Sequence, residues 1–269
     1  MHELRGYVSS HYLGLLSVPR FIPHRIRHFR QLHRARPAAD IAVNVSALQR
    51  DGLAVIENFL NRDQIDELRR NIPEVDAFES SPEGAGSLFF PDAHRIPGLK
   101  TFFGDPRLRS IAQSYVSREA IPLRQTIGLK VAKGDIGSSE MNYHMDTWKM
   151  RLKAFLFLHD VTATEAPLCY LKGSHKGAWR LWTEARINRY YEVDEKGYAA
   201  SKERYHLSAF WPHEVRQLIT DYDYEEVLCT GSAGTVVLFD GRGLHRATPL
   251  VGERRLILTS YWVHPGEHT

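Results

Sequence analysis

The chain has 269 residues, of which 43% are hydrophobic and 25% charged, as is typical of a globular protein with at least one large folded domain. No apolar stretch reaches the length of about 18 residues that a membrane span needs, and no signal-peptide pattern opens the chain, so we expect a cytoplasmic protein. The two cysteines, Cys169 and Cys229, lie in apolar runs, which predicts core residues rather than a disulfide.

The net charge of +3 is unevenly distributed, because residues 1–36 carry seven arginines and one acid, Glu3, and the remainder sums to −3. We assign 1–44 to a basic N-terminal arm, for which two interpretations stand. The arm lies on the inner face of an anionic membrane and holds a lipid-linked substrate, or it packs its apolar residues on the domain. Pro19 and Pro23 interrupt any single long helix. The slightly acidic body has no recognised nucleic-acid-binding motif, which argues against nucleic acid as a partner.

The first half of the remaining chain predicts helices around one short strand. Asn61 is a suitable cap for the second of these helices. A segment rich in proline, glycine, serine and acids reads as a loop that borders a site. In chain order we expect a helix at 46–52, a strand at 53–57, a helix at 62–71, the loop at 73–98 and a helix at 106–117.

The second half consists of short β-rich runs separated by glycine and proline, which indicates an antiparallel sandwich or barrel. The stretch 176–225 is too long for a hairpin loop, so we interpret it as an insertion with its own helices and turns. The chain from 45 to 269 is therefore predicted to be a single, mainly β domain with flanking helices (α+β). The expected strands are 121–133, 152–158, 167–171, 227–230, 235–239 and 256–262.

A candidate metal site is formed by His144, Asp146 and the distant His245. His144 and Asp146 lie where a loop enters a strand, and residues two apart on a strand point to the same side. Two imidazoles and one carboxylate suit a ferrous ion that keeps positions open for oxygen and a keto acid. His159 and His175 are interpreted as structural, since one ends a strand and the other lies in a turn.

A candidate anion-binding arginine follows His245 on the next strand. Arg254 or Arg255 would lie one strand across from the metal, where a guanidinium can hold a carboxylate with two parallel hydrogen bonds. Strand alternation alone does not choose between them, because their in-phase neighbours are about equally apolar.

Several sequence blocks, in this order and spacing, resemble those of the phytanoyl-CoA dioxygenase family of Fe(II)/2-oxoglutarate-dependent oxygenases. The resemblance covers about residues 48 to 263. It implies a double-stranded β-helix (a jelly roll, or cupin-like fold), one Fe(II) ion, 2-oxoglutarate as cosubstrate and O2. The blocks that carry it are 51–60, 131–133, 144–146, 171–175 and 245–261.

The resemblance also implies roles for individual residues. It makes His144, Asp146 and His245 the iron ligands. Family members that halogenate replace the carboxylate with a small residue, so Asp146 favours hydroxylation. Trp148, two residues further on, is either a wall of the substrate pocket or a core residue.

For the cosubstrate, the resemblance implies that Arg254 is the clamp, because the family's arginine stands seven residues before an aromatic that here is Tyr261. Leu129 matches a strand position that contacts the cosubstrate in relatives. The family often has serine two residues after the second histidine, but this chain has Ala247 there. Thr248 is the nearest residue that can supply a hydroxyl.

These observations together predict an enzyme that hydroxylates an unactivated C–H bond of a small-molecule or lipid-linked, anionic or sugar-bearing substrate and releases succinate and CO2. Two alternatives remain open. One is a jelly-roll metalloenzyme that catalyses hydrolysis or isomerisation with another divalent ion. The other is a binding protein that keeps the fold without turnover.

Overall fold

The structure is a computed structural model that describes residues 26, 37–80, 87–131, 142–146, 149–177, 179, 210 and 212–267. Most of the predicted arm and most of the insertion at 176–225 lie outside these residues. The predicted membrane contact of the arm therefore stays a prediction. Within the described part of the chain, no helix is long and apolar enough to span a membrane.

The first described helix, α2, begins at Ala39, seven residues before the predicted start at position 46. Ile41, Val45 and Leu48 form its buried stripe, and the spacing of these apolar residues carries the helix back into what was assigned to the arm. The next helix, α3, begins as predicted. Asn61 accepts a hydrogen bond from the backbone of Gln64 and its own N–H donates to the Gln64 side chain.

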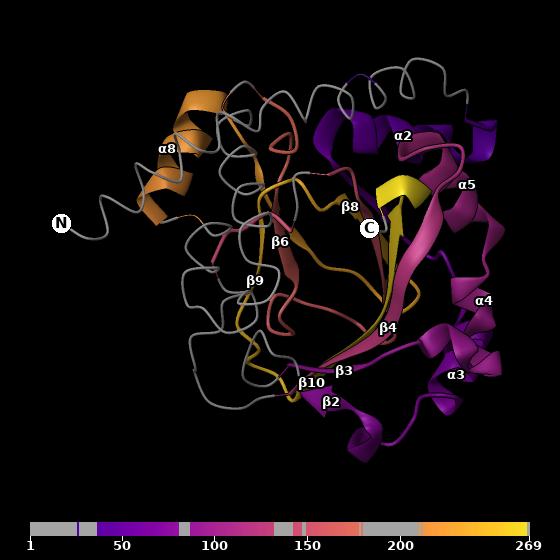
Figure 1. The fold of residues 1–269 in the computed structure, drawn as a ribbon. Coiled ribbons are helices and arrows are strands. Elements are labelled where there is room, and N and C mark those ends of the chain that lie inside the picture. Colours follow the sequence, from indigo (N-terminus) through magenta and orange to yellow (C-terminus); the bar gives the residue numbers. More distant parts are fainter. Residues whose placement is uncertain are drawn as a thin grey trace.

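Helices α2 to α5 lie together on one side of the molecule, and α8 lies on the opposite side (Figure 1). The helix α8 falls within the predicted insertion. The α-helices are α2 (Ala39–Asp51), α3 (Arg62–Arg70), α4 (Lys100–Phe103), α5 (Pro106–Tyr115) and α8 (Pro212–Tyr222). Single 3₁₀ turns are η1 (Val75–Ala77), η2 (Ala93–Arg95), η3 (Pro97–Leu99) and η5 (Pro265–Glu267).

The strands form two antiparallel sheets, and the fold is the predicted jelly roll with flanking helices. The larger sheet has the order β1-β8-β5-β10-β4-β3-β2, and the smaller has the order β7-β6-β9. The strands are β1 (Leu53–Ile56), β2 (Glu79–Ser80), β3 (Ser87–Phe90), β4 (Ile121–Val131), β5 (Leu152–Phe157), β6 (Leu168–Leu171), β7 (Glu226–Cys229), β8 (Val236–Asp240), β9 (His245–Ala247) and β10 (Arg254–Val263).

The predicted loop at 73–98 is wrong in part, because it contains β2 and β3. Ser87 to Phe90 pair with residues 127–130 of β4. Hydrogen bonds to this long strand therefore stabilise the short strand β3 near the edge of the sheet. The turn after β8 likewise continues into the short strand β9, which pairs with β6. Pairing of this kind depends on residues distant in sequence, which local patterns do not report.

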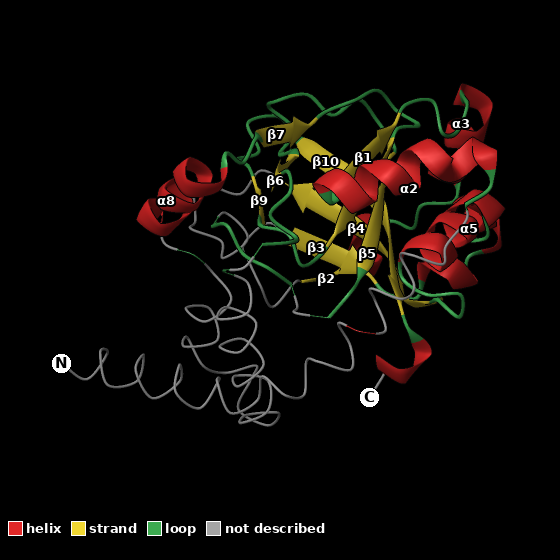
Figure 2. Cartoon of the chain, turned by 90° about the horizontal axis from the view of Figure 1, so that it is seen from above, coloured by secondary structure: helices red, strands yellow, loops and turns green. Residues whose placement is uncertain are grey.

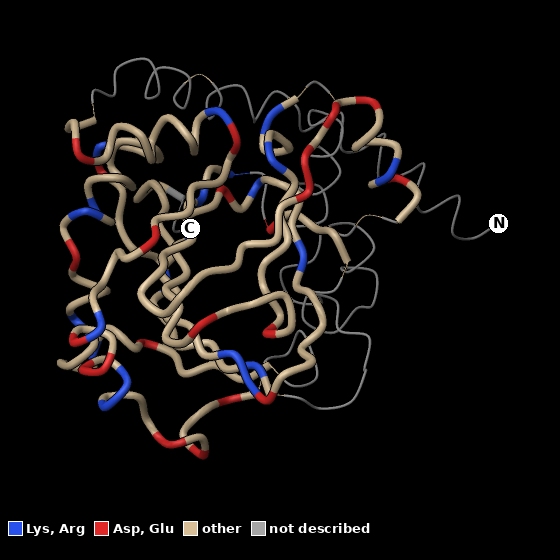
Figure 3. The backbone as a smooth tube through the Cα atoms, turned by 180° about the vertical axis from the view of Figure 1, so that it is seen from behind, with Lys and Arg blue, Asp and Glu red and all other residues tan. Residues whose placement is uncertain are grey.

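Three apolar clusters connect the layers, which Figure 2 shows from above. One lies between the larger sheet and helices α2 to α5, and includes Leu258 of β10. The second lies between the two sheets, and includes Ile257 of the same strand. The third packs the smaller sheet against α8. Cys169 and Cys229 are buried and free, as predicted. Acidic and basic positions alternate along the described chain and do not gather in a single block (Figure 3).

Candidate metal centre

The three predicted ligands come together between the two sheets. His245 begins β9, and its ring lies 5.2 Å, centroid to centroid, from Phe239 of the opposite sheet. His144 and His245 exchange backbone hydrogen bonds of 2.9 and 3.0 Å, and the Asp146 N–H donates to the Gly241 carbonyl at 2.9 Å. One ligand atom from each of His144, Asp146 and His245 lies within 4.8 Å of the other two, close enough for one ion to contact all three.

Hydrogen bonds orient both imidazoles for metal binding. Nδ1 of His144 lies 2.9 Å from the Asn142 carbonyl, and Nδ1 of His245 lies 2.8 Å from the Gly243 carbonyl. Because a carbonyl only accepts, each ring carries its proton on Nδ1 and keeps the Nε2 lone pair for an ion. Burial and the neighbouring His245 lower the pKa of His144 to about 4, so this ring is neutral at neutral pH.

The Gly-Arg-Gly turn before His245 leaves room for two side chains. A Cβ atom at Gly241 would lie 2.7 Å from Oδ2 of Asp146, and one at Gly243 would lie 1.9 Å from the hydroxyl of Tyr170. The Tyr170 ring stacks on His245 at a centroid distance of 6.3 Å. Both glycines are therefore required by close approach, one to a ligand and one to the residue that packs on a ligand.

Lys153 of β5 is a site residue that sequence reasoning missed. Its Nζ lies 2.6 Å from Oδ2 of Asp146 and 4.7 Å from the ring centroid of Tyr261. Burial opposes the charge on Lys153, but Asp146 outweighs it, so the pKa of this lysine is raised. Burial also opposes the charge of Asp146 and by itself would raise the pKa of this carboxyl group. Lys153 and then His245 outweigh burial and hold that pKa well below its usual range. The carboxylate is thus ionised and available to an ion.

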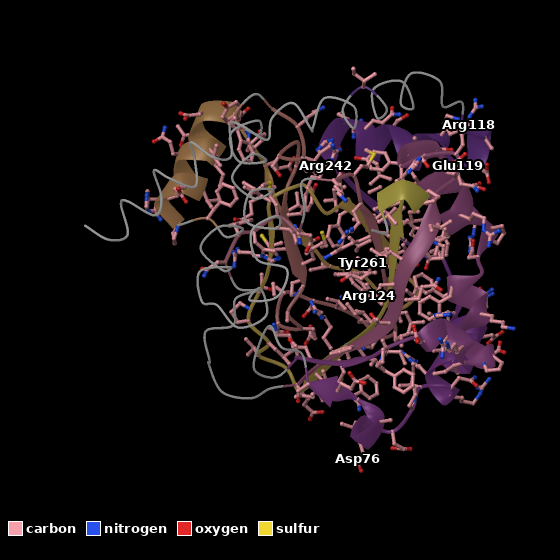
Figure 4. All side chains as sticks on the ribbon, in the orientation of Figure 1. Asp76, Arg118, Glu119, Arg124, Arg242 and Tyr261 are labelled. Atoms are coloured by element: carbon pink, nitrogen blue, oxygen red, sulfur yellow. The ribbon has the colours of Figure 1, made fainter. Side chains whose placement is uncertain are left out.

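A buried carboxylate secures the turn that carries Gly241 and His245. Asp240, at the end of β8, accepts hydrogen bonds from the Tyr115 hydroxyl at 2.7 Å and from the Arg242 guanidinium at 2.6 Å. Burial disfavours this charge, yet Arg242 keeps the pKa of Asp240 far below its usual range. Arg242 is labelled in Figure 4. A fully buried ion pair with further hydrogen bonds restricts the turn to one conformation.

The two candidate clamp arginines point in opposite directions. Arg254 is exposed and shares its side of β10 with Leu258, which packs against the helices. Arg255 shares its side with Ile257, which packs between the sheets, and its guanidinium donates to the Ala166 carbonyl. The structure therefore directs Arg255 into the space between the sheets and leaves Arg254 outside, contrary to the position predicted for Arg254.

Thr248 lies near Arg255. This threonine is buried, and its hydroxyl donates to the Pro167 carbonyl at 2.8 Å, next to Ala166, whose carbonyl accepts from Arg255. Thr248, predicted to bind the cosubstrate, and Arg255, the alternative clamp, thus reach adjacent peptide groups.

Leu129, in contrast, lies on the outer side of β4. Its register partner is Leu256, which packs against the helix-side core, so strand alternation turns Leu129 away from the space between the sheets. The inward neighbour is Lys130, which is buried and pairs in register with Arg255. Lys130 was not predicted as a site residue, although a lysine is rarely buried in a strand without a special role.

The other predicted residues contribute differently. Trp148 lies outside the described residues. His159 and His175 do not join the candidate metal cluster within the described part of the chain. His175 is buried against the turn after α2, where a Cβ atom at Gly52 would lie 2.5 Å from its Nδ1. A structural role fits its position.

Comparison with protein families gives a match over most of the chain. The sequence model of the phytanoyl-CoA dioxygenase (PhyH) family matches residues 48–255. The chain belongs to the phytanoyl-CoA dioxygenase family. A search of curated protein sequences gives no significant match.

Solved structures show that other enzymes share this family member's jelly-roll fold. The alpha-ketoglutarate-dependent epimerase SnoN from nogalamycin biosynthesis is 16% identical, with a TM-score of 0.56 over 84% of this chain and 83% of SnoN. HygX from Streptomyces hygroscopicus, solved with nickel and 2-oxoglutarate, is 13% identical, with a TM-score of 0.58 over 83% and 87%. EctD from S. alaskensis, solved with 2-oxoglutarate and 5-hydroxyectoine, is 17% identical, with a TM-score of 0.57 over 87% and 84%.

Proposed function

We propose that this protein is an Fe(II)- and 2-oxoglutarate-dependent oxygenase that hydroxylates a small-molecule substrate. The observation that carries the proposal is the cluster of His144, Asp146 and His245, whose ligand atoms lie within 4.8 Å of one another. Membership of the phytanoyl-CoA dioxygenase family supports it. When bound, iron, 2-oxoglutarate and O2 supply the oxidising power, and succinate and CO2 are released.

The donor set fits a ferrous ion. Two imidazoles and one ionised carboxylate match the ligands that such an ion takes when it keeps open positions. The carbonyls behind both histidines fix which nitrogen faces the ion. Lys153 holds Oδ2 of Asp146 in place and limits how that carboxylate can turn. The protein thus fixes the geometry around the ion before it binds.

The inner face of β10 and β4 supplies a place for the distal carboxylate of the keto acid. We assign the clamp to Arg255, with Thr248 and Lys130 beside it. Arg255 and Lys130 are register partners, and Thr248 reaches the peptide group next to the one that Arg255 binds. Two cations and a hydroxyl suit a carboxylate.

Hydroxylation is the outcome we propose, because Asp146 keeps the carboxylate position filled. The mass of the product tests this choice. A hydroxylated product gains one oxygen atom, whereas an epimerised product keeps the mass of its substrate.

The proposed function is tested by measuring O2 consumption and succinate release in the presence of Fe(II) and 2-oxoglutarate over a panel of metabolites. We expect both activities in the wild type and neither in His144→Ala. Ni(II) binding by calorimetry provides a second readout, and we expect it to weaken strongly in His144→Ala. If the wild type bound no divalent ion, or bound it equally well without His144, the proposal would be wrong.

The clamp assignment is tested by comparing Arg255→Gln with Arg254→Gln. Loss of a charge-assisted, two-point contact costs about 1.5–3 kcal/mol, so the Kd for 2-oxoglutarate should rise about 10- to 100-fold in Arg255→Gln. Arg254→Gln is the matched control and should bind the keto acid like the wild type. The reverse result would return the clamp to Arg254.

A further inference from the structure

A row of three inward side chains borders the metal centre. Tyr261 of β10 pairs in register with Arg124 of β4 on one side and with Lys153 of β5 on the other. Register partners project from the same face of a sheet. Since Lys153 reaches Asp146, the whole row lies on the face of the larger sheet that is turned toward the proposed metal ligands. Figure 4 shows Arg124 and Tyr261 next to each other on the side of β4 and β10 that faces β6.

The charges along this row are not balanced. The charge of Lys153 is matched by Asp146. The side chain of Arg124 is exposed and, among the described residues, has neither a hydrogen bond nor an ion pair. Arg151 immediately precedes β5, and its Nε is buried without a partner in the described part of the chain. Arg151 is close enough for its charge to act on Lys153. Within the part of the chain that the structure describes, two guanidinium charges therefore lack a counter-ion beside the proposed reaction centre.

The cosubstrate does not account for these charges. Its proposed clamp, Arg255, stands six residues before Tyr261 on β10, which corresponds to about 20 Å of strand at roughly 3.3 Å per residue. The distal carboxylate of 2-oxoglutarate would thus be held well away from Arg124. The proposed metal ligands already contain their own carboxylate in Asp146. What remains for Arg124 is the molecule on which the enzyme acts.

We propose that the substrate carries a carboxylate or phosphate group, and that Arg124 binds this group beside the metal centre with the Tyr261 hydroxyl as a second donor. The inference rests on the proposed function and names the substrate class of that site. A guanidinium fork matches both anions with two parallel hydrogen bonds, and the nearby charge of Arg151 makes the surroundings positive. The anionic group would fix how the rest of the substrate faces the iron.

The experiment uses the full-length protein loaded with Ni(II) and saturating 2-oxoglutarate, so that added anions find the metal and the clamp occupied. Benzoate, phenyl phosphate and the uncharged benzyl alcohol are titrated by calorimetry. The variants are Arg124→Gln, Arg124→Lys and the control Arg118→Gln. Arg118 is an exposed arginine far from Tyr261 in Figure 4.

We expect benzoate or phenyl phosphate to bind the wild type and benzyl alcohol not to bind. Arg124→Gln should weaken the anion by at least about tenfold, Arg124→Lys should restore part of the affinity, and Arg118→Gln should leave it unchanged. The anion that binds with the lower Kd indicates whether the substrate carries a carboxylate or a phosphate group. No binding of either anion, equal binding in Arg124→Gln, or an equal loss in Arg118→Gln would overturn the inference. A separate titration with 2-oxoglutarate tests the proposed function. If the protein did not bind 2-oxoglutarate, the proposed function would fail, and the anions would then be titrated against the protein loaded with Ni(II) alone.

Discussion

Replacing Lys153 with methionine tests how the charge of Asp146 is balanced. Methionine keeps the length and apolar stem of lysine but removes the ammonium that lies 2.6 Å from Oδ2 of Asp146. The side chains of Lys153 and Asp146 are only 9% and 17% exposed, so the remaining carboxylate is largely desolvated. Removing one partner of a buried ion pair lowers the free energy of unfolding by about 3–5 kcal/mol. Because Asp146 is partly exposed, we expect the lower value, about 3 kcal/mol, in the metal-free protein.

A bound ion changes this result, because it supplies the positive charge that the variant lacks. We expect the loss in the metal-loaded protein to be about 1 kcal/mol. By the thermodynamic cycle, the difference of about 2 kcal/mol must appear as tighter metal binding, roughly 30-fold. Lys153→Met should therefore be less stable than the wild type and yet bind Ni(II) more tightly.

The assay is thermal unfolding with and without Ni(II), together with calorimetric titration of the ion. For a chain of this size, the expected decrease in Tm is about 6–12 °C without metal and about 2–4 °C with it. Lys172→Met is the matched control, because Lys172 pairs with the exposed Glu225 at 2.9 Å and such surface pairs contribute less than about 1 kcal/mol. An equal decrease in both states, or weaker Ni(II) binding, would refute the reasoning.

Two further substitutions test the surroundings of the ligands. Gly241→Ala places a Cβ atom 2.7 Å from Oδ2 of Asp146, so the carboxylate must shift, and the Kd for Ni(II) should rise about 10-fold; an unchanged Kd by calorimetry would contradict this. Tyr115→Phe removes a 2.7 Å hydrogen bond to the buried carboxylate of Asp240 and should lower the free energy of unfolding by about 1–3 kcal/mol. Urea unfolding measures that loss, and a midpoint equal to that of the wild type would show that Arg242 alone satisfies Asp240.

The candidate metal cluster could be predicted from sequence because the chemistry and the context of its residues are both local. His144 and Asp146 stand two apart after a loop, and His245 follows a glycine-rich turn at the end of a clear strand. The strands of the core were likewise predictable from apolar runs between glycines and prolines. The cap at Asn61 is a local hydrogen-bond pattern and was also predicted correctly.

The phase of a strand was not predictable, and this explains why strand alternation does not choose between Arg254 and Arg255. Whether Arg254 or Arg255 points inward depends on which side of β10 meets the second sheet. Ile257 and Leu258 are equally apolar, so neither distinguishes the face between the sheets from the face under the helices. Leu129 was assigned from the family resemblance, and the register with Leu256 places it on the outer side of β4. Only the register with neighbouring strands decides such cases.

The role of Lys153 as a partner of Asp146 was also predictable from the sequence. It is the only charged residue within β5, whose other members are apolar. A lysine in such a strand must either snorkel to solvent or meet a buried anion. The nearest carboxylates in sequence are Asp146, seven residues before it, and Asp160, seven residues after it, and of these Asp146 is the proposed ligand. A charged residue that interrupts an apolar strand next to a proposed ligand therefore indicates a partner of that ligand.

The fold and the cofactor do not determine the reaction. Solved structures of this fold include an alpha-ketoglutarate-dependent epimerase and a complex that contains 5-hydroxyectoine. Because a shared fold is compatible with different outcomes, the choice depends on which bond of the substrate is held against the ion. Among the residues that the structure describes, those of the row through Tyr261 are placed beside the proposed ligands to hold a substrate. An anion bound at Arg124 would set the distance from its own charge to the reacting carbon. The search for the substrate should therefore begin with compounds whose oxidisable carbon lies a short, fixed distance from a carboxylate or phosphate.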